Sequence, residues 1–264
     1  MTRILAITNQ KGGVGKTTTT VNLAAGLAAS GKRVLLVDLD PQANATMGSG
    51  IDKRALTATV YEVLLGLSTP ESVRRRSEAG AYDVLPANRE LAGAEVEMVG
   101  LEHRETRLKS ALMTIVNQYD FILIDCPPAL SLLTLNGLVA AQAVMIPMQC
   151  EYYALEGLSD LVNTIKKVRA HLNPMLEIEG LLRTMFDPRN TLAIQVSDQL
   201  KEHFGNKVYA TIIPRNVRLA EAPSYGAPAI NFDRACKGSQ AYLALVLEIL
   251  ARQGDMTVPV AAAV

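Results

Sequence analysis

The 264-residue sequence has no excess of charge of either sign. It contains 26 Lys and Arg residues and 26 Asp and Glu residues, so its formal net charge is zero. This balance argues against a uniformly basic coat protein for nucleic acids, although it leaves room for a local basic patch. Charged residues make up only 20% of the chain and hydrophobic residues 49%, which excludes a disordered chain and predicts a sizeable core.

Cysteine is also scarce. The chain has three cysteines, an odd number, and they are widely spaced at Cys126, Cys150 and Cys236 without a CxxC motif. This pattern argues against a disulfide framework and against a zinc site, and it fits a reducing compartment.

Long hydrophobic runs are missing as well. No apolar stretch of signal-peptide length opens the chain, and the most apolar segment, residues 132–148, is interrupted by Asn136, Gln142 and Pro147. We predict that this segment is a buried helix running into a buried strand. Together with the cysteines, these absences predict a cytoplasmic protein without a membrane span.

Short β-branched runs alternate with longer helical patterns along the chain. Strands are predicted at residues 4–8, 34–38, 82–85, 121–125, 143–147, 180–185 and 208–213, and helices at 17–29, 158–172 and 240–253. The first, second, fourth and fifth strands are almost continuously apolar, which is typical of strands buried on both faces of a parallel sheet. The alternation predicts an α/β fold with a doubly wound, mostly parallel sheet flanked by helices.

In such a sheet the ligand lies at the carboxyl ends of the strands. We expect a single domain over residues 1–253 and a disordered tail over residues 254–264, which lack periodicity. The basic run at residues 74–76 is interpreted as a solvated helix end.

The strongest motif is N-Q-K-G-G-V-G-K-T-T at residues 9–18, between the first strand and an Ala-rich helix. Its glycines let backbone N–H groups turn toward a phosphate, and the helix N-terminus adds a positive dipole. Lys16 is placed to meet the β- and γ-phosphates, and the Thr17 hydroxyl to coordinate Mg²⁺. The predicted phosphate-binding residues are Lys11, Gly12, Gly13, Val14, Gly15, Lys16, Thr17 and Thr18.

Aspartates end two of the apolar strands. Asp38 and Asp40 close the second strand, and Asp125 closes the fourth. One such aspartate would be explained more simply as a helix cap or turn residue. Two apolar strands that end in this way beside a phosphate loop favour a functional role for these carboxylates, and Asp38, two residues before Asp40 on the same side of the strand, is placed to support Asp40.

The phosphate loop departs from the common G-x-x-x-x-G-K-[ST] pattern, because Gln10 stands where the first glycine belongs. The K-G-G-x-G-K-T-T pattern resembles the deviant Walker A loop of the ParA/MinD class of P-loop ATPases. The resemblance implies that Lys11 reaches across an ATP-sandwiched dimer to the partner's nucleotide, where a cation stabilises developing charge. It also implies that Asp125 is the Walker B residue, which together with Thr17 holds Mg²⁺, and that Asp40 orients the attacking water. The implied catalytic residues are Lys11, Lys16 and Asp40.

Over nearly its whole length the chain is similar to the chromosomal ParA (Soj) subgroup. The resemblance is carried by residues 9–18, 37–46, 125–128, 149–157 and 213–223. It implies that Pro214 and Asn216 contact adenine and that Arg189 and Arg218 bind DNA. Ala43 departs from the glycine that is usual in the family at this position, and this change is expected to stiffen the first switch.

The resemblance implies a DNA-partitioning ATPase with ATP and Mg²⁺ as cofactors. Its ATP-dependent homodimer would bind double-stranded DNA without sequence preference in the nucleoid. A ParB-type partner would then trigger hydrolysis, which is slow without it, and release. Residues 160–240 hold 11 basic and 8 acidic residues, which is a weak basic bias. The candidate phosphate contacts in this region are Arg189, Lys201, Lys207, Arg215 and Arg218.

Two other functions stay open at this point. A MinD-like ATPase that cycles on membranes would need a basic amphipathic helix at the carboxyl terminus, whereas residues 242–252 resemble a core helix with one basic residue, Arg252. A small-molecule ligase or synthetase on the same scaffold, such as the dethiobiotin or cobyrinic acid enzymes, would not need Lys11 before the glycines.

Overall fold

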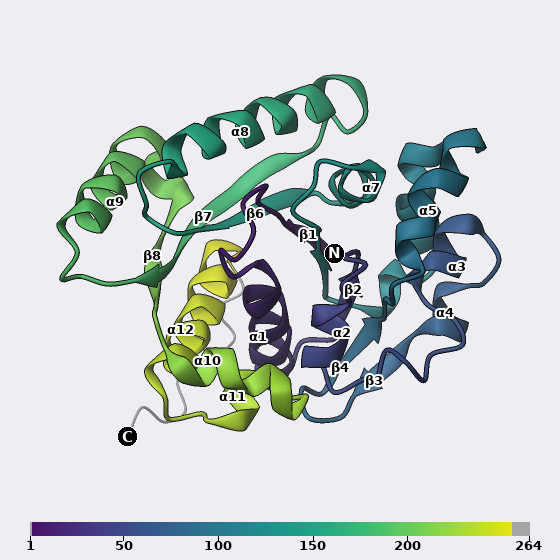
Figure 1. The fold of residues 1–264 in the computed structure, drawn as a ribbon, viewed down its shortest axis with the longest axis horizontal. Helices are drawn as coiled ribbons and strands as arrows, with labels where there is room; N and C mark the ends of the chain where they lie inside the picture. Colours follow the sequence, from purple (N-terminus) through teal and green to yellow (C-terminus); the bar gives the residue numbers. More distant parts are fainter. Residues whose placement is uncertain (1, 255–264) are drawn as a thin grey trace.

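A twisted sheet of eight strands crosses the computed structural model, which describes residues 2–254 (Figure 1). The strands are β1 (Arg3–Ile7), β2 (Val34–Asp38), β3 (Arg75–Ser77), β4 (Tyr82–Leu85), β5 (Phe121–Asp125), β6 (Ala143–Met148), β7 (Glu177–Phe186) and β8 (Val208–Pro214). Their order in the sheet is β3-β4-β2-β5-β1-β6-β7-β8. Only β3 runs antiparallel to its neighbour among these strands, so the predicted doubly wound, mostly parallel sheet is confirmed.

Helices cover both faces of the sheet (Figure 1). One face carries α3 (Val60–Leu65), α5 (Leu91–Glu97), α6 (Arg107–Met113), α7 (Leu132–Ala140), α8 (Ala154–His171) and α9 (Thr191–Phe204). The other carries α1 (Lys16–Ala29), α2 (Asn44–Gly48), α10 (Val217–Glu221), α11 (Ala229–Phe232) and α12 (Lys237–Arg252). The short elements α4 (Pro70–Val73), η1 (Met98–Gly100), η2 (Arg104–Thr106), η3 (Val116–Gln118), η4 (Gly205–Lys207) and η5 (Ala222–Tyr225) lie in the connections.

Each central strand is buried on both sides. In β1, Ile4 and Ala6 belong to the hydrophobic cluster on one face of the sheet, and Leu5 and Ile7 belong to the cluster on the other. This arrangement explains the continuous apolar runs, because alternate side chains of such a strand both face packed helices.

The predicted elements differ from the structure mainly at one edge. The prediction missed β3, because a three-residue edge strand with charged side chains has no apolar pattern. Arg74 does cap α4, but Arg75 and Arg76 lie in β3, so their assignment to a helix end was wrong. Arg76 Nη1 pairs with Asp83 Oδ1 of β4 at 3.0 Å. The longest strand, β7, also begins three residues before its predicted start.

The other edge of the sheet is covered by a side chain. The backbone N–H groups of Ala210 and Thr211 in β8 donate to the two carboxylate oxygens of Glu248 on α12, at 2.8 and 2.9 Å. Arg252, one turn later on α12, pairs with the same carboxylate at 2.8 Å. Burial alone would raise the pKa of Glu248, but these donors outweigh burial and lower it.

Residues 255–264, most of the predicted tail, lie outside the described part of the chain, and Gly254 is an exposed turn residue. None of the helices in residues 2–254 is both long enough and apolar enough to cross a bilayer. The single-domain boundary at residue 253 stays a prediction.

Candidate nucleotide-binding site

The phosphate loop connects the end of β1 to the start of α1, as predicted. Asn9 fixes its entry, since its side-chain amide donates to Pro147 O at 2.8 Å and its side-chain oxygen accepts from Lys11 N at 3.0 Å. Gly13 and Gly15 have φ angles of 75° and 88°, which lie in the left-handed region that glycine adopts readily. Gly15 is followed directly by Lys16 at the first position of α1.

Lys16 is buried beside carboxylates. Only 7% of the residue is exposed, and its Nζ donates to Lys11 O at 3.3 Å. Burial lowers the pKa of Lys16, and the negative charges of Asp125 and Asp40 oppose this effect. Its ammonium group therefore lies at the end of the loop with an incomplete set of partners, where anionic oxygens would be favourable ligands.

Thr17 and Asp125, the two predicted metal ligands, are in contact. Thr17 Oγ1 donates to Asp125 Oδ2 at 2.8 Å, and the Thr20 hydroxyl lies 3.1 Å from Asp125 Oδ1. Burial raises the pKa of the Asp125 carboxyl, and the nearby charge of Asp38 raises it further. A hydroxyl and a carboxylate oxygen at this spacing form a donor set that suits Mg²⁺, whose charge would favour the ionised carboxylate.

Asp38 lies directly beside Asp125 on the neighbouring strand, because the two residues pair in the register of β2 and β5. Its carboxylate accepts from Thr46 N at 2.8 Å, from Thr46 Oγ1 at 2.7 Å and from Asp40 N at 3.1 Å. Asp38 thus ties the segment that carries Asp40 to the start of α2. Thr46 was not singled out in the sequence, since a threonine in a short helix has no local pattern that marks this role.

The segment between Asp40 and α2 contains a strained residue. Asp40 is partly exposed, and its Oδ1 accepts from Gln42 N at 2.9 Å. Ala43 has a φ of 54° and is fully buried. For a residue with a Cβ this left-handed conformation costs about 1–2 kcal/mol, which gives a physical reason for a glycine at this position.

Lys11 forms an ion pair within the chain. Its Nζ pairs with Glu151 Oε2, and both side chains are about half exposed. The described chain thus holds this lysine at the end of β6, on the surface next to the phosphate loop.

A cavity of about 300 Å³ lies on the other side of the loop. Gly15 and Thr18 contribute to one wall, and the predicted adenine contacts Pro214 and Asn216 to another. The Asn216 side-chain oxygen caps α10 by accepting from Arg218 N at 2.9 Å, which leaves its amide group as a donor.

Two residues of this cavity were missed in the sequence. Thr184 and Met185 line it from the end of β7, and the Thr184 hydroxyl donates to Val14 O in the phosphate loop at 2.7 Å. The sequence offered one signal for these two residues, since both lie at the carboxyl end of the strand predicted at residues 180–185. The order of the strands in the sheet brings this end next to the phosphate loop.

The two residues predicted to bind DNA, Arg189 and Arg218, are exposed, and each already pairs with a carboxylate of its own chain. Arg189 makes two hydrogen bonds to Asp187, at 2.9 and 2.8 Å, and lowers the pKa of Asp187 to about 2. Arg218 pairs with Glu221 at 2.9 Å and with Asp233 at 3.3 Å.

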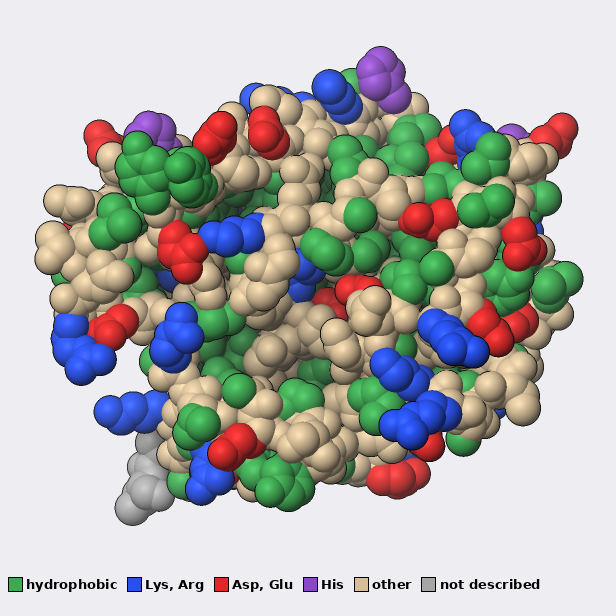
Figure 2. All heavy atoms as spheres, in the orientation of Figure 1, with side chains coloured by type: hydrophobic (Ala, Val, Ile, Leu, Met, Phe, Trp, Pro, Cys, Tyr) green, Lys and Arg blue, Asp and Glu red, His purple; other side chains and the backbone are tan. Residues whose placement is uncertain are grey.

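The five candidate basic residues do not form one patch. Arg189, Arg215 and Arg218 follow the carboxyl ends of β7 and β8, and Arg215 is close enough to Asp187 to lower its pKa. Figure 2 shows Lys and Arg side chains mixed with Asp and Glu in this region, at the lower left of the view. Lys201 pairs with Asp198 on α9.

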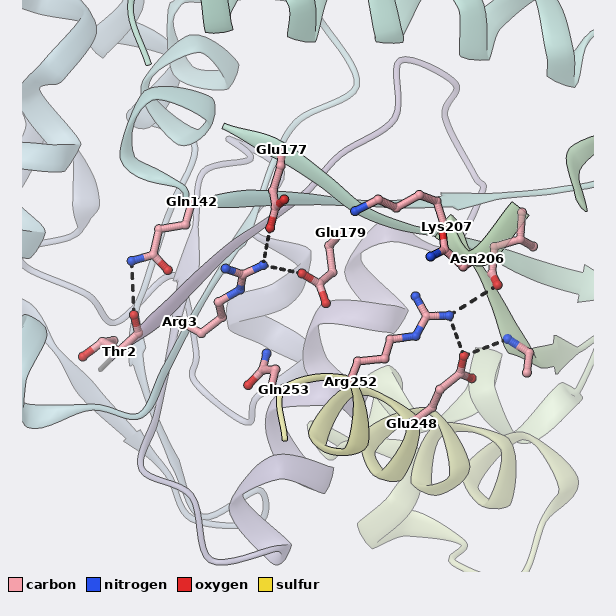
Figure 3. A pocket seen from close by; sticks show the side chains of 12 residues that line it. Thr2, Arg3, Gln142, Glu177, Glu179, Asn206, Lys207, Glu248, Arg252 and Gln253 are labelled. Carbon is pink, nitrogen blue, oxygen red and sulfur yellow. Dashed lines mark hydrogen bonds and ion pairs between the residues drawn. The ribbon is translucent and has the colours of Figure 1, made fainter. Parts of the chain in front are cut away.

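Lys207 lies elsewhere, in a separate cavity of about 800 Å³ at the amino ends of the strands (Figure 3). There Arg3 pairs with Glu177 and Glu179, and Arg252 pairs with Glu248. Within the described residues, the structure therefore separates Lys207 from the arginines with which it was grouped.

Comparison with known proteins gives matches over nearly the whole chain. The model of an AAA domain family matches residues 2–178. The sporulation initiation inhibitor protein Soj of Bacillus subtilis is 55% identical over 251 residues, which cover 95% of this chain and 99% of that protein. The chromosome partitioning protein ParA of Caulobacter vibrioides is 50% identical over 255 residues, with 96% of each chain covered.

Solved structures with bound nucleotide are similar as well. Cobyrinic acid a,c-diamide synthase from Mycobacterium smegmatis with ADP and magnesium has a TM-score of 0.84 and 40% identity, covering 96% of this chain and 97% of that one. The septum site-determining protein MinD of Pyrococcus horikoshii with Mg-ADP has a TM-score of 0.77 and 26% identity over the full length of both chains.

Proposed function

Because the chain belongs to the ParA/Soj family of chromosome-partitioning ATPases, we propose that it moves DNA by a cycle of ATP binding, dimerisation, DNA binding and hydrolysis. It is a partitioning ATPase with ATP and Mg²⁺ as cofactors. The observation that carries the proposed chemistry is the contact between Thr17 and Asp125 beside the buried Lys16.

In the proposed cycle, residues 11–18 bind the phosphates and Lys16 neutralises their charge. Thr17 and Asp125 hold Mg²⁺, which would supply electrostatic stabilisation of the transferring phosphoryl group. The cavity at Pro214 and Asn216 takes the adenine.

Two further residues complete the proposed chemistry. Lys11 leaves Glu151 and enters the partner protomer's site, and Asp40 orients water for in-line attack. The ties from Asp38 to Asp40 N and Thr46 support this assignment, because they hold the backbone on both sides of Asp40.

We further propose that the dimer binds duplex DNA without sequence preference through Arg189 and Arg218, with Arg215 beside them. Dimerisation doubles the set, so weak contacts from two protomers act together. A ParB-type partner then stimulates hydrolysis, which is slow alone, and the protein leaves the nucleoid. The ion pairs of Arg189 and Arg218 with carboxylates are consistent with contacts that are weak and reversible.

The two alternative functions predict different behaviour. Helix α12 buries Tyr242, Leu245, Val246, Ile249 and Leu250 in the core, so this helix does not offer an apolar face to a membrane. One of the similar solved structures is titled as a small-molecule enzyme, cobyrinic acid a,c-diamide synthase. If this chain were such an enzyme, its use of ATP would not respond to DNA.

The test is binding to a random-sequence duplex without nucleotide, with ADP and with ATP, each with Mg²⁺ and at several salt concentrations. Of the three conditions, we expect DNA binding only in the one with ATP. If each dimer makes four phosphate contacts, its affinity for DNA should fall about a hundredfold when the salt concentration rises from 50 to 200 mM. The Asp40→Ala variant should remain bound to DNA after ATP is added, because it does not hydrolyse the ATP. The Lys16→Ala variant should not bind DNA, because it does not bind ATP.

Arg218→Glu should keep ATP-dependent dimerisation and lose DNA, with Arg169→Glu, an exposed arginine on α8, as the matched control. Duplex binding by the nucleotide-free chain at physiological salt would contradict the proposal. Normal hydrolysis by Asp40→Ala would contradict the role of Asp40.

A further inference from the structure

Two glycines from distant parts of the chain are in contact through their backbones. Gly50 lies just after α2, and Gly226 caps the end of η5. Gly226 O lies 2.7 Å from the position that a Cβ on Gly50 would occupy, and Gly50 Cα lies 3.1 Å from the position of a Cβ on Gly226. Both residues have left-handed backbones, with φ angles of 81° and 62°. A side chain at either position would therefore force the two segments apart.

The first of these segments runs from Asp40 to Gly50 and is called the Asp40 segment below. Its position is set by the Asp38 carboxylate, which accepts from Asp40 N and from Thr46 N. Asp40 is close enough to Lys16 for its charge to oppose the lowering of the Lys16 pKa by burial. The start of the segment thus lies where the proposed chemistry has a γ-phosphate in ATP and none in ADP.

The second segment, residues 217–233, carries Arg218 in a packed unit and is called the Arg218 segment below. The Arg218 guanidinium carbon lies 5.9 Å from the centroid of the Phe232 ring. The Tyr225 ring stacks on the other ring, with the two centroids 4.6 Å apart. Gly226 directly follows Tyr225, so direct contacts and one peptide bond link this glycine to the arginine.

The two segments have room to shift beside their contact. A cavity of about 400 Å³ is lined by Asn44 and Met47 of α2 and by Pro223 and Ser224 of η5. Figure 1 shows α2 next to the short helices of the Arg218 segment. Protein interiors are usually packed without spaces of this size. The cavity therefore allows α2 and η5 to move, while the glycines keep the ends of both elements in contact.

The contact also joins the two places that have to communicate if ATP and ADP act differently. The two nucleotides contain the same adenine, so the adenine cavity by itself cannot distinguish them. They differ at the γ-phosphate, which the proposed chemistry places beside Lys16 and Asp40. A signal within one protomer that reaches Arg218 only with ATP has to start at the Asp40 segment. That segment touches the Arg218 segment through Gly50 and Gly226.

We propose that Gly50 and Gly226 are positioning residues that make the placement of Arg218 depend on the γ-phosphate. A γ-phosphate beside Asp40 shifts the Asp40 segment and with it α2, whose end then moves η5 through the contact of the two backbones. Neither glycine has a side chain that would absorb the shift. The coupling is reciprocal, so DNA that holds Arg218 favours the position that the Asp40 segment takes with ATP. The inference rests on the proposed function, since it explains how ATP favours DNA binding.

The test compares Gly226→Ala with Gly31→Ala. Gly31 has a φ of 80°, but among the described residues no atom beyond its chain neighbours lies within 4 Å of its Cβ position. It is therefore the matched control for backbone strain without the close contact. With a non-hydrolysable ATP analogue, Gly226→Ala should dimerise like the wild-type chain in analytical ultracentrifugation. At concentrations that keep it dimeric, it should bind a random-sequence duplex about tenfold more weakly in fluorescence anisotropy. Gly31→Ala should match the wild-type chain in both measurements.

Gly50→Ala tests the same contact from the other segment and should weaken DNA binding to a similar extent. The double variant, Gly50→Ala with Gly226→Ala, should bind DNA about as well as either single variant, because one contact is lost only once. Effects that add in the double variant would overturn the inference. DNA affinity equal to that of the wild-type chain in Gly226→Ala would overturn it as well.

Hydrogen exchange in the wild-type chain provides a measurement that does not depend on the stability of any variant. It follows the backbone amides of residues 44–50 in the dimer with the ATP analogue, with and without the duplex. Because the coupling is reciprocal, DNA held at Arg218 should slow exchange in α2. Unchanged exchange there would overturn the inference, although DNA binding itself would stand. Absence of ATP-dependent DNA binding in the wild-type chain would instead reject the proposed function.

Discussion

Lys11 is the residue whose described position differs most from its proposed role. It is paired with Glu151 of its own chain, on the surface beside the phosphate loop. To reach a partner's nucleotide it must break this ion pair. Exposed pairs of this kind contribute about 0.2–1 kcal/mol, so the pair opposes dimerisation weakly and does not prevent it.

We therefore predict that Glu151→Gln lowers the protein concentration needed for ATP-dependent dimerisation, by about two- to fivefold. The variant keeps the shape of the side chain but frees Lys11. Analytical ultracentrifugation of the Asp40→Ala background with ATP measures the effect without interference from hydrolysis. A weaker dimer would show instead that Glu151 contributes its own contact across the interface. Glu202→Gln, an exposed glutamate on α9, is the control.

Among the elements, β8 depends on a side chain from another element. Glu248 of α12 accepts from two consecutive N–H groups of this edge strand and from Arg252. Since these bonds lower the pKa of Glu248 despite its burial, the folded chain binds the ionised carboxylate better than the unfolded chain does. This contribution to stability is complete above the ordinary pKa of 4.5 and is lost as the pH falls through the lower, folded value.

Glu248→Gln should accordingly lower the free energy of unfolding by about 1–2 kcal/mol at pH 7, because one amide oxygen replaces two charged acceptors. The difference from the wild-type chain should shrink as the pH is lowered below about 4.5. Urea denaturation at pH 7 and at pH 3 measures both values. A difference that is equal at the two pH values would mean that packing, and not charge, accounts for the loss.

Which elements could be predicted follows from what each one requires of its sequence. Buried strands need continuous apolar runs, so β2 and β5 were predicted with their observed bounds. The phosphate loop is local and needs glycines at fixed positions, so it too was predicted. β3 needs only one neighbour and no apolar face, which leaves no signal in three residues.

Contacts between distant segments were the least predictable part of the site. The bond from Thr184 to Val14 spans 170 positions, and the ties from Asp38 to Thr46 depend on how the chain turns after β2. A single sequence contains the residues of such contacts but not their pairing. The grouping of Lys207 with Arg218 failed for the same reason, because closeness along the chain placed together residues that the two ends of β8 separate.

At the scale of the whole molecule, nucleotide binding should stabilise the fold, since the loop, β5, β7 and β8 all contribute to the site. With Mg-ATP at a hundredfold excess over its dissociation constant, we expect about 2.7 kcal/mol of stabilisation, or roughly 5–10 °C in Tm. Differential scanning fluorimetry with ATP and Mg²⁺, and with ATP and EDTA, measures the shift. Chelation should reduce it, because Thr17 and Asp125 then lose the metal.

Lys16→Ala should show no shift with Mg-ATP, while its Tm without nucleotide should stay close to that of the wild-type chain. Burial of an ammonium group with incomplete partners is unfavourable, so its removal costs the empty protein little. Lys109→Ala is the matched control and should respond as the wild type does. An undiminished shift in Lys16→Ala would place the nucleotide elsewhere.

Both edges of the sheet are protected against pairing with another chain, and this matters when many copies of the protein bind next to one another. An open edge strand is a template on which another chain can add a strand, and this is a common route to irreversible fibres. Here one edge is the short β3 with its two arginines, and at the other Glu248 occupies backbone donors of β8. Many copies can therefore bind side by side along one DNA molecule without forming backbone hydrogen bonds between their sheets. They can separate again when the side-chain contacts between them and the DNA are lost.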